Sequence, residues 1–279
     1  MVKLGHYSEV EVVKEVDFGF YIDGGPFGEI LLPTNSAKPG VKAGDEITVF
    51  TYCDSEDRMI ATMERPLATA DQFAFLRVKD VGPVGAFLDW GLLKDLLVPY
   101  REQSLEMRQG HSYVVRVYVD ELTERIVAST RLNRFLKDKN EDLEVEQEVD
   151  LIVVAETDLG WKVIVNRKYW GMVFHSEIFQ EMAKGYQLKG FVKNIREDGK
   201  LDIALQKQGY QQVESTANWL MQVLEKRNGF LALTDKSAPE LIYQELNVSK
   251  KVFKKAIGSL YKQRLITLEA DGIQLVKNP

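Results

Sequence analysis

The amino-acid sequence predicts a mainly β protein, in which three similar five-stranded barrels are followed by a small α+β domain. The first observation behind this prediction is a spacing that occurs three times. A residue that closes an apolar run lies 14 positions after each of three glycines, and a second glycine lies 25 positions after each of them. The three sets are Gly19, Pro33 and Gly44; Gly85, Pro99 and Gly110; and Gly160, Phe174 and Gly185. The second observation is that the hydrophobic period changes near Glu214 from that of strands to that of helices.

Each copy, starting near residues 7, 73 and 148, alternates short apolar strands with Gly and Pro. The second copy shows the pattern most completely, with predicted strands at 75–78, 86–88, 96–98, 113–119 and 125–129. Five strands within about 60 residues match the size of an oligonucleotide-binding (OB) barrel. The sequence therefore predicts four domains, namely barrels at 1–66, 67–137 and 138–209 and a C-terminal domain at 210–279.

The first copy resembles an S-one domain, the RNA-binding barrel first known from ribosomal protein S-one. Segments 18–22, 42–47 and 54–58 and the apolar turn that ends at Pro33 carry this resemblance. It implies a binding face with two aromatic side chains around the first glycine, a His where Pro33 stands, and an Asp and an Arg on the last hairpin. In the first copy the matching residues are Phe18, Tyr21, Asp54 and Arg58.

The other two copies keep part of this face. The second copy has Val84 in place of the first aromatic residue, and it matches the remaining positions with Phe87, Asp120 and Arg125. The third copy departs furthest, because its residues at the same positions are Leu159, Lys162, Arg196 and Lys200. No copy has the family His in register, since Pro33, Pro99 and Phe174 stand there, and His175 follows Phe174 by one place.

Strand alternation separates core from surface around the first glycine. Phe20 and Ile22 share a parity that suits the barrel interior. The same alternation leaves Phe18 and Tyr21 on the outer face, where they are candidates for stacking on bases.

The C-terminal segment shows three helices and a hairpin in that order. An apolar stripe predicts the first helix, with members Trp219, Leu220, Val223 and Leu224. Ser237 and Glu240 have the spacing of a capping box, which predicts a second helix at 241–246 with Ser237 as N-cap. A third helix begins near Lys250, and Asp271-Gly272 between two short alternating segments predicts a hairpin. This is the order of a winged helix.

The third of these helices has two chemically different sides. The residues predicted to face its core are Val252, Phe253, Ala256, Ile257, Leu260 and Tyr261. The opposite side carries Lys251, Lys254, Lys255 and Lys262. Such a helix can lie on phosphates or in a DNA groove. The lysines can equally form a solvated face on a domain that binds a protein partner, and the sequence leaves both interpretations open.

Three divergent S-one domains followed by a winged helix resemble, over nearly the whole chain, the conserved virulence factor B family of low-GC Gram-positive bacteria. The ordered combination carries this resemblance, rather than a single motif. It implies a regulatory role in gene expression, including the regulation of virulence.

Composition narrows the classes of function. The net charge is −6, with 26 basic and 35 acidic residues up to residue 210 and 10 basic and 7 acidic residues after it. An acidic body must hold nucleic acid through local basic patches and stacking, whereas the basic C-terminal part can bind the backbone directly. The single cysteine, Cys53, fits a reducing compartment. Neither a secretory signal nor a run of roughly 18 apolar residues is present, so we expect a cytoplasmic protein with no membrane contact.

Motifs for catalysis and for metal binding are absent from the sequence. His6, His111 and His175 lack ligand spacing, and neither a P-loop nor a Gly-x-Ser-x-Gly elbow occurs. The segment 138–150 is rich in acidic residues that could hold a divalent metal, although a solvated linker between the second and third copies is the favoured interpretation. We therefore expect no cofactor and no metal.

The sequence as a whole predicts a non-enzymatic protein that holds single-stranded RNA on its barrel faces by stacking and basic contacts. The candidate RNA-binding residues are Phe18, Tyr21, Asp54, Arg58, Phe87, Asp120, Arg125, Lys162, Phe174, His175 and Lys200. One alternative is a DNA-binding regulator whose winged helix carries specificity while the barrels act as spacers. A metal-dependent nuclease is a second alternative, and the least favoured because no ligand cluster is visible.

Overall fold

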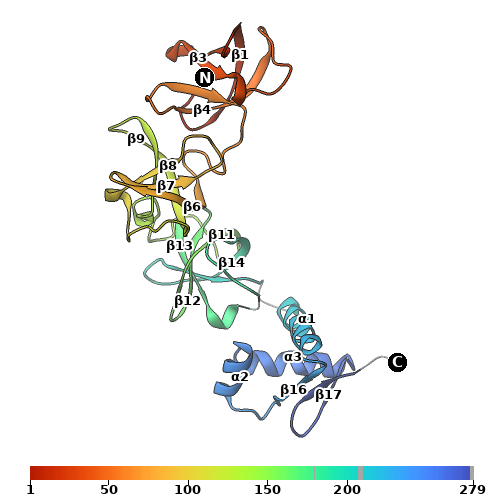
Figure 1. The fold of residues 1–279 in the computed structure, drawn as a ribbon. Helices are drawn as coiled ribbons and strands as arrows, with labels where there is room; N and C mark the ends of the chain where they lie inside the picture. The colour runs from red at the N-terminus through yellow and green to blue at the C-terminus, as the bar shows by residue number, and fades with distance from the viewer. Residues whose placement is uncertain (179, 207–209, 277–279) are drawn as a thin grey trace. The chain divides into compact units, whose positions relative to one another are not determined.

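The computed structural model describes residues 1–178, 180–206 and 210–276 (Figure 1). The chain divides into two compact units, Met1–Phe135 (unit 1) and Leu136–Pro279 (unit 2). Unit 1 contains the first and second barrels, and unit 2 contains the third barrel and the C-terminal helices. The fold is mainly β with a C-terminal α+β domain, as the sequence predicts. The predicted boundary at residues 209 and 210 falls at segment 207–209, which lies outside the described residues.

The first barrel is a closed sheet with strand order β1-β2-β3-β5-β4. Its strands are β1 (Tyr7–Val16), β2 (Gly19–Asp23), β3 (Glu29–Pro33), β4 (Glu46–Cys53) and β5 (Met59–Thr62). Alternation along β2 places Phe20 and Ile22 in the core. Phe18, just before β2, is 58% exposed, so the predicted division between core and face is confirmed at this strand.

The second barrel has five strands in the same order as the first, but its sheet is not closed by hydrogen bonds. Its strands are β6 (Phe73–Gly82), β7 (Gly85–Asp89), β8 (Leu96–Pro99), β9 (Ser112–Asp120) and β10 (Arg125–Ser129). They form a five-stranded sheet of order β10-β9-β6-β7-β8, and in unit 1 no ladder joins β8 to the neighbouring β10. Within unit 1 the two barrels share one hydrophobic cluster, in which the Phe50 ring of β4 lies 5.8 Å from the Trp90 ring at an angle of 78°.

The third barrel is again closed, with order β11-β12-β13-β15-β14. Its strands are β11 (Glu148–Thr157), β12 (Gly160–Val165), β13 (Tyr169–Phe174), β14 (Gln187–Ile195) and β15 (Leu201–Ala204). The acidic segment before β11 is not simply a solvated linker, because Leu143 is buried in this barrel's core and Asp142 accepts hydrogen bonds from Lys168 and from the Tyr169 hydroxyl. The buried Leu143 and the hydrogen-bonded Asp142 thus fasten part of this segment to the barrel.

The repeated glycines occupy equivalent positions in all three barrels, as their spacing predicts. Gly19 pairs with Pro33, and the corresponding pairs are Gly85 with Pro99 and Gly160 with Phe174. Their φ angles are 154°, 152° and 152°. A Cβ atom on each glycine would lie only 2.1–2.3 Å from a carbonyl oxygen of the paired strand. Glycine is therefore required by both the conformation and the close approach of the backbone.

The second glycines of the repeat are equivalent as well. The amide of each donates to a carbonyl of the first strand of its barrel, at 2.7–2.9 Å, in the pairs Gly44 with Val12, Gly110 with Val78 and Gly185 with Val153. A short 3-10 helix follows the third strand of each barrel, and the three are η2 (Thr34–Ser36), η3 (Tyr100–Glu102) and η5 (His175–Glu177). The three copies therefore share one backbone plan.

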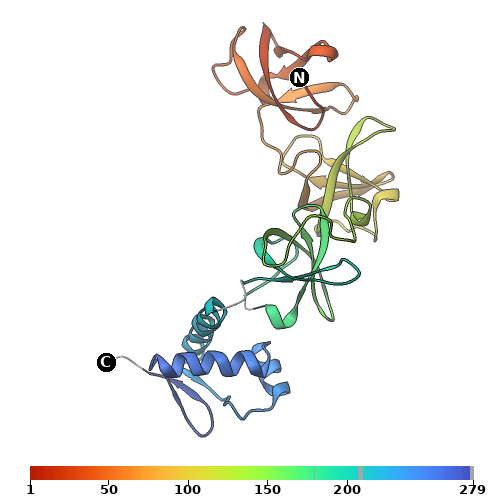
Figure 2. The same cartoon turned by 180° about the vertical axis from the view of Figure 1, so that it is seen from behind.

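The C-terminal domain is a winged helix. Its elements are α1 (Tyr210–Lys226), β16 (Phe230–Leu231), α2 (Pro239–Leu246), α3 (Lys250–Lys262), β17 (Ile266–Leu268) and β18 (Ile273–Leu275). The strands form a sheet of order β16-β18-β17, and α1 packs against α3, as the view from behind also shows (Figure 2). None of the helices in the described part of the chain has the length and apolar character that crossing a bilayer requires.

Two details of this domain correct the sequence predictions. The second helix begins at Pro239 with Ala238 as N-cap, and the Ser237 hydroxyl accepts a hydrogen bond from the amide of Thr234 at 2.9 Å instead of capping the helix. The preceding turn thus uses the hydroxyl, and the predicted capping box is wrong. Tyr261, predicted to face the core, is 55% exposed, because the buried stripe of α3 ends at Leu260.

Candidate nucleic-acid interface

The first barrel presents two aromatic rings beside Gly19. Phe18 and Tyr21 lie on either side of the glycine, and their ring centroids are 6.4 Å apart at an interplanar angle of 82°. The Lys14 ammonium lies 4.8 Å from the centroid of the Tyr21 ring and forms an ion pair with Glu29 at 2.5 Å. An edge-to-face pair in which the Phe18 ring is exposed and the Tyr21 ring is partly buried, with a cation nearby, offers a platform for bases and a contact for the backbone that links them.

Asp54 and Arg58 meet on the hairpin between β4 and β5, as predicted for this copy. The Arg58 Nε donates to Asp54 at 2.8 Å, and Arg58 also pairs with Glu56 at 2.9 Å. Burial alone would raise the pKa of Asp54, but hydrogen bonds from the side chain and backbone of Arg58 outweigh it and hold that pKa below its ordinary value. The guanidinium itself remains exposed, so this carboxylate orients Arg58 while leaving it accessible.

In the second barrel the predicted Asp and Arg lie opposite each other but take different partners. Asp120 and Arg125 are paired in the ladder between β9 and β10. The carboxylate of Asp120 nevertheless binds Arg101, and the guanidinium of Arg125 binds Asp57 of the first barrel. A direct Asp120–Arg125 ion pair of the kind seen in the first copy is therefore not formed, because each side chain has found another partner in unit 1.

The second barrel also carries an aromatic residue that the sequence interpretation missed. Tyr100 begins η3, is 51% exposed, and donates a hydrogen bond from its hydroxyl to the carbonyl of Gly82 at 2.8 Å. His175 begins η5 in the third barrel, and its Nε2 lies 3.2 Å from the carbonyl of Thr157. Tyr100 and His175 each lie 15 residues after the first glycine of their copy, Gly85 or Gly160. The carbonyls that they contact each lie three residues before that glycine. Comparing the copies at this spacing could therefore have identified Tyr100 from the sequence.

The face of the third barrel is built from cations that lie over rings. The Lys162 ammonium sits 3.7 Å from the centroid of the Trp170 ring, and the Arg196 guanidinium lies 5.6 Å from the ring of Phe174. Burial lowers the pKa of Lys162. The negative charge of Asp138, which lines the same pocket, offsets part of this lowering. A partly desolvated cation at a pocket wall is well suited to a phosphate.

These residues line a small pocket of about 200 Å³, to which Lys162, Trp170, Arg196 and Lys200 contribute. Arg196 is held by Asp202 at 2.8 Å, and Lys200 is paired with Asp198 at 2.8 Å. The structure thus brings the predicted Lys162 and Lys200 together and adds Trp170 and Arg196. Trp170 had no family position to suggest it, and Arg196 was visible only as a substitution of the family Asp.

The predicted lysines of the winged helix lie on the outer side of α3. Lys251, Lys255 and Lys262 are exposed, and Lys254 lies 3.8 Å from Asp235. Ser249 caps the helix by accepting a hydrogen bond from the amide of Val252 at 3.3 Å. The lysine face is therefore available to a ligand. In the described residues, His, Cys, Asp and Glu side chains form no group of three or more that could hold a metal ion.

Comparisons with known proteins agree with this domain plan. Residues 4–64 match the family model of the S1 domain, the S-one family, and residues 218–275 match the CvfB-like winged helix domain. The uncharacterized protein YitL of Bacillus subtilis is 28% identical over 271 residues, which cover 92% of this chain and 89% of that protein. Conserved virulence factor B of Staphylococcus epidermidis is 26% identical over 267 residues, covering 92% of this chain and 90% of that protein.

A solved structure is also similar in sequence. It is described as a multidomain protein with nucleic acid binding domains from Streptococcus pneumoniae, is 26% identical, and covers 98% of both chains with a TM-score of 0.44. S1 barrels and winged helices are nucleic-acid-binding domains. The domain matches and the relatives confirm that this nucleic-acid-binding protein resembles, over most of its length, the conserved virulence factor B family.

Proposed function

We propose that the chain is a non-enzymatic, cytoplasmic protein that holds single-stranded RNA along its barrel faces and thereby regulates gene expression. The observation that carries this proposal is the edge-to-face pair of the exposed Phe18 ring and the partly buried Tyr21 ring, on the barrel that matches the S1 domain and beside the accessible Arg58 guanidinium. Single-stranded nucleic acid binds to such a combination because every base has a face that can stack and every link carries a charge.

The three barrels contribute different contacts in this proposal. The first stacks bases on Phe18 and Tyr21 and binds the backbone through Arg58. The second adds Phe87, Arg125 and the exposed Tyr100. The third supplies Lys162, Arg196 and Lys200 for phosphates, beside Phe174 and His175. Asp54 and Asp120 pair with Arg58 and Arg101 and orient these arginines beside the RNA. Several modest contacts on one chain reach useful affinity through their high effective concentration.

The direct test is a fluorescence-anisotropy titration of the full chain with labelled single-stranded RNA, single-stranded DNA and duplex DNA at two salt concentrations. We expect single-stranded RNA to bind most tightly, with an affinity that falls as salt rises. Incubation of the same RNA with Mg²⁺ or Mn²⁺ should leave it intact, and metal-dependent cleavage would contradict the non-enzymatic part of the proposal. If duplex DNA binds more tightly than either single strand, the RNA proposal is wrong.

A second candidate function is favoured by the exposed lysine face of α3. A winged helix with this face can contact duplex DNA through its phosphates. Replacing Lys251, Lys254 and Lys255 together by Ala should then flatten the logarithmic salt dependence by up to about one unit for each lost contact. If the lysines bind a protein partner instead, neither the affinity for nucleic acid nor its salt dependence should change.

A further inference from the structure

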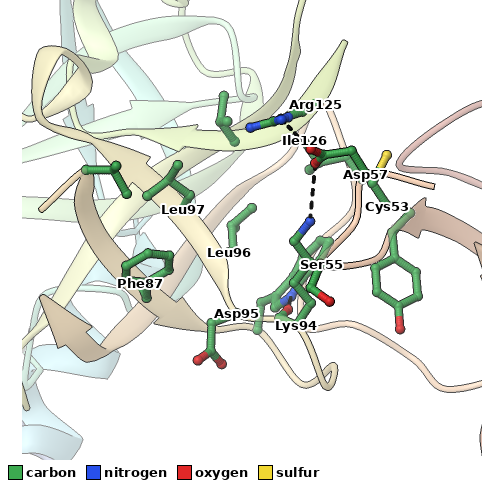
Figure 3. Close-up of a pocket in the computed structure, with 14 residues that line it drawn as sticks. Cys53, Ser55, Asp57, Phe87, Lys94, Asp95, Leu96, Leu97, Arg125 and Ile126 are labelled. Atoms are coloured by element: carbon green, nitrogen blue, oxygen red, sulfur yellow. Dashed lines mark hydrogen bonds and ion pairs between the residues drawn. The ribbon is translucent and has the colours of Figure 1, made fainter. Parts of the chain in front are cut away.

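A pocket of about 460 Å³ lies in unit 1 where the turn between β4 and β5 meets the second barrel (Figure 3). The first barrel contributes Ser55 and Asp57 from this turn, and the second barrel contributes Phe87, Lys94, Leu96 and Arg125. This volume is in the range of pockets that hold small organic ligands. The binding face of the second barrel is therefore not a flat surface, because the first barrel encloses one side of it.

The pocket has an apolar part and a charged part. Phe87, Leu96 and Ile126 belong to its apolar lining. At its charged edge the Asp57 carboxylate points toward two cations, as the dashed lines in Figure 3 show. It forms an ion pair with Arg125 and lies 3.9 Å from the Lys94 ammonium. A ligand with an apolar flat group and an anionic group matches these two parts.

The Asp57 carboxylate lies between two cations, the Arg125 guanidinium and the Lys94 ammonium. Arginine pairs with carboxylates and phosphates through the same planar set of N–H donors. All three side chains are about half exposed, so water weakens their attraction and a competing anion can reach them. Arg125 is one of the residues that the sequence assigns to RNA contact, and in this structure its guanidinium is bound to a carboxylate of the protein itself.

We propose that this pocket binds one nucleotide of a single strand, with the base against Phe87 and the phosphate replacing the Asp57 carboxylate between Arg125 and Lys94. The proposal rests on the proposed RNA-binding function and adds a site shared by the first two barrels. Asp57 is then an internal competitor that lowers the affinity of this site.

The test is the substitution Asp57→Asn in the full chain, measured by anisotropy with a labelled oligouridylate of about twelve nucleotides, a length within the range that OB barrels bind. Asp57 has a φ of 63°, a conformation that Asn adopts readily, so the turn should be preserved. The matched control is Glu106→Gln, which removes the same charge at an exposed residue of unit 1 that does not line the pocket. Melting curves of both variants confirm that each is folded.

We expect Asp57→Asn to raise the affinity about fivefold and Glu106→Gln to change it less than about twofold. In a background with Arg125→Gln the gain from Asp57→Asn should largely disappear, because one of the two released cations is missing. An equal gain in both backgrounds, or no gain while the wild-type chain binds, overturns the proposal. If neither the wild-type chain nor Asp57→Asn binds the oligouridylate, the RNA-binding function itself fails, which is a distinguishable result.

Should Asp57→Asn weaken binding instead, the ion pair serves to fasten the two barrels, and the competitor interpretation is wrong.

Phe87→Ala provides an independent measurement of the base contact. It should lower the affinity about tenfold in both the wild-type and the Asp57→Asn backgrounds, because the ring contacts the base and not the phosphate. An unchanged affinity in both backgrounds would remove the base from the pocket and overturn the proposal.

Discussion

The first and third barrels share a backbone but present different chemistry on the same face. Both are closed sheets of the same strand order, and both turn at a glycine with a φ near 150°. Two residues after this glycine the first barrel has Tyr21 and the third has Lys162, and ten residues after it they have Glu29 and Trp170. In the third barrel the lysine lies over the Trp170 ring, whereas Lys14 of the first barrel is paired with Glu29.

This difference teaches which residues the fold depends on. The glycines and the buried alternate positions are fixed by backbone contact and packing. The side chains on the outer face are not needed for either, so one copy can present open rings and another can present cations. The predictions below test first the shared frame and then the separate faces.

The largest effect is expected where the two barrels are the same. Gly160→Ala would place a Cβ 2.1 Å from the Val173 carbonyl oxygen, and Gly19→Ala would place one 2.3 Å from that of Leu32. We expect each substitution to lower the free energy of unfolding of its unit by about 3 kcal/mol, measured by urea denaturation followed by circular dichroism.

The control for this prediction is Gly258→Ala in α3, where a Cβ would meet nothing within 4 Å. It should stabilise the winged helix by about 0.5–1 kcal/mol, because alanine is the better helix former. If the costs at Gly19 and Gly160 differ by more than about 1 kcal/mol, the two barrels do not depend on the glycine in the same way.

The next effect concerns the face of the first barrel. Replacing Phe18 and Tyr21 together by Ala should weaken the binding of single-stranded RNA by about 2 kcal/mol with little change in salt dependence, because the rings contact bases and release no counter-ions. Anisotropy titrations at several salt concentrations measure both quantities. A variant that fails to fold would show that these rings stabilise the barrel, which would contradict their assignment to its binding face. A clear change in salt dependence would contradict the stacking role.

A smaller effect, of opposite character, is expected on the face of the third barrel. Lys162→Gln should weaken binding by about 1 kcal/mol and flatten the salt dependence by about 0.7 units, the value for one phosphate contact to a single strand. Lys162→Arg, which keeps the charge, should retain most of the affinity. If Lys162→Gln changes affinity without changing the salt dependence, the ammonium does not contact a phosphate.

The same lysine predicts a dependence on pH. Burial lowers the pKa of Lys162 in the folded protein below its ordinary value of 10.5. At a pH between the folded and the unfolded pKa, the unfolded chain therefore binds more protons than the folded one. The contribution of Lys162 to the free energy of unfolding should therefore rise with pH across this window, while its contact with phosphate is lost. Both trends should be absent in Lys162→Gln, and their persistence would assign them to another group.

The smallest effect is expected at the start of the 3-10 helices. Tyr100 and His175 make equivalent contacts with the carbonyls of Gly82 and Thr157. His175→Tyr should therefore change the free energy of unfolding by less than about 0.5 kcal/mol and strengthen RNA binding by less than about 1 kcal/mol, since it adds one ring to the face. A strong loss of stability would show that the two positions are not interchangeable.

The sequence was sufficient to predict the barrels because their frame depends on residues that cannot be exchanged. The spacing from Gly19 to Pro33 is the length of the hairpin formed by β2 and β3, and the spacing from Pro33 to Gly44 is the length of the segment that leads to β4. Both lengths are the same in all three copies. Alternation in β2 was enough to separate Phe20 from Phe18, and Asp271-Gly272 correctly marked the hairpin between β17 and β18.

The partners of surface side chains could not be predicted in the same way. Asp120 and Arg125 lie opposite each other in the ladder between β9 and β10, yet Arg125 pairs with Asp57, which is 68 residues away in the chain. Similarly, Ser237 had the correct spacing for a cap, but the hydrogen bond to Thr234 competes for its hydroxyl. Which partner a surface side chain binds is decided by small differences in free energy among nearby groups. These differences produce no periodic pattern in the sequence, so they cannot be predicted from it.

The seam between β8 and β10 gives the second barrel a kinetic property that the closed barrels lack. Since no ladder crosses this seam in unit 1, the strands can separate there while the four remaining ladders stay intact. The amide hydrogens of β10 that face the seam should then exchange with solvent through local fluctuations, without waiting for global unfolding.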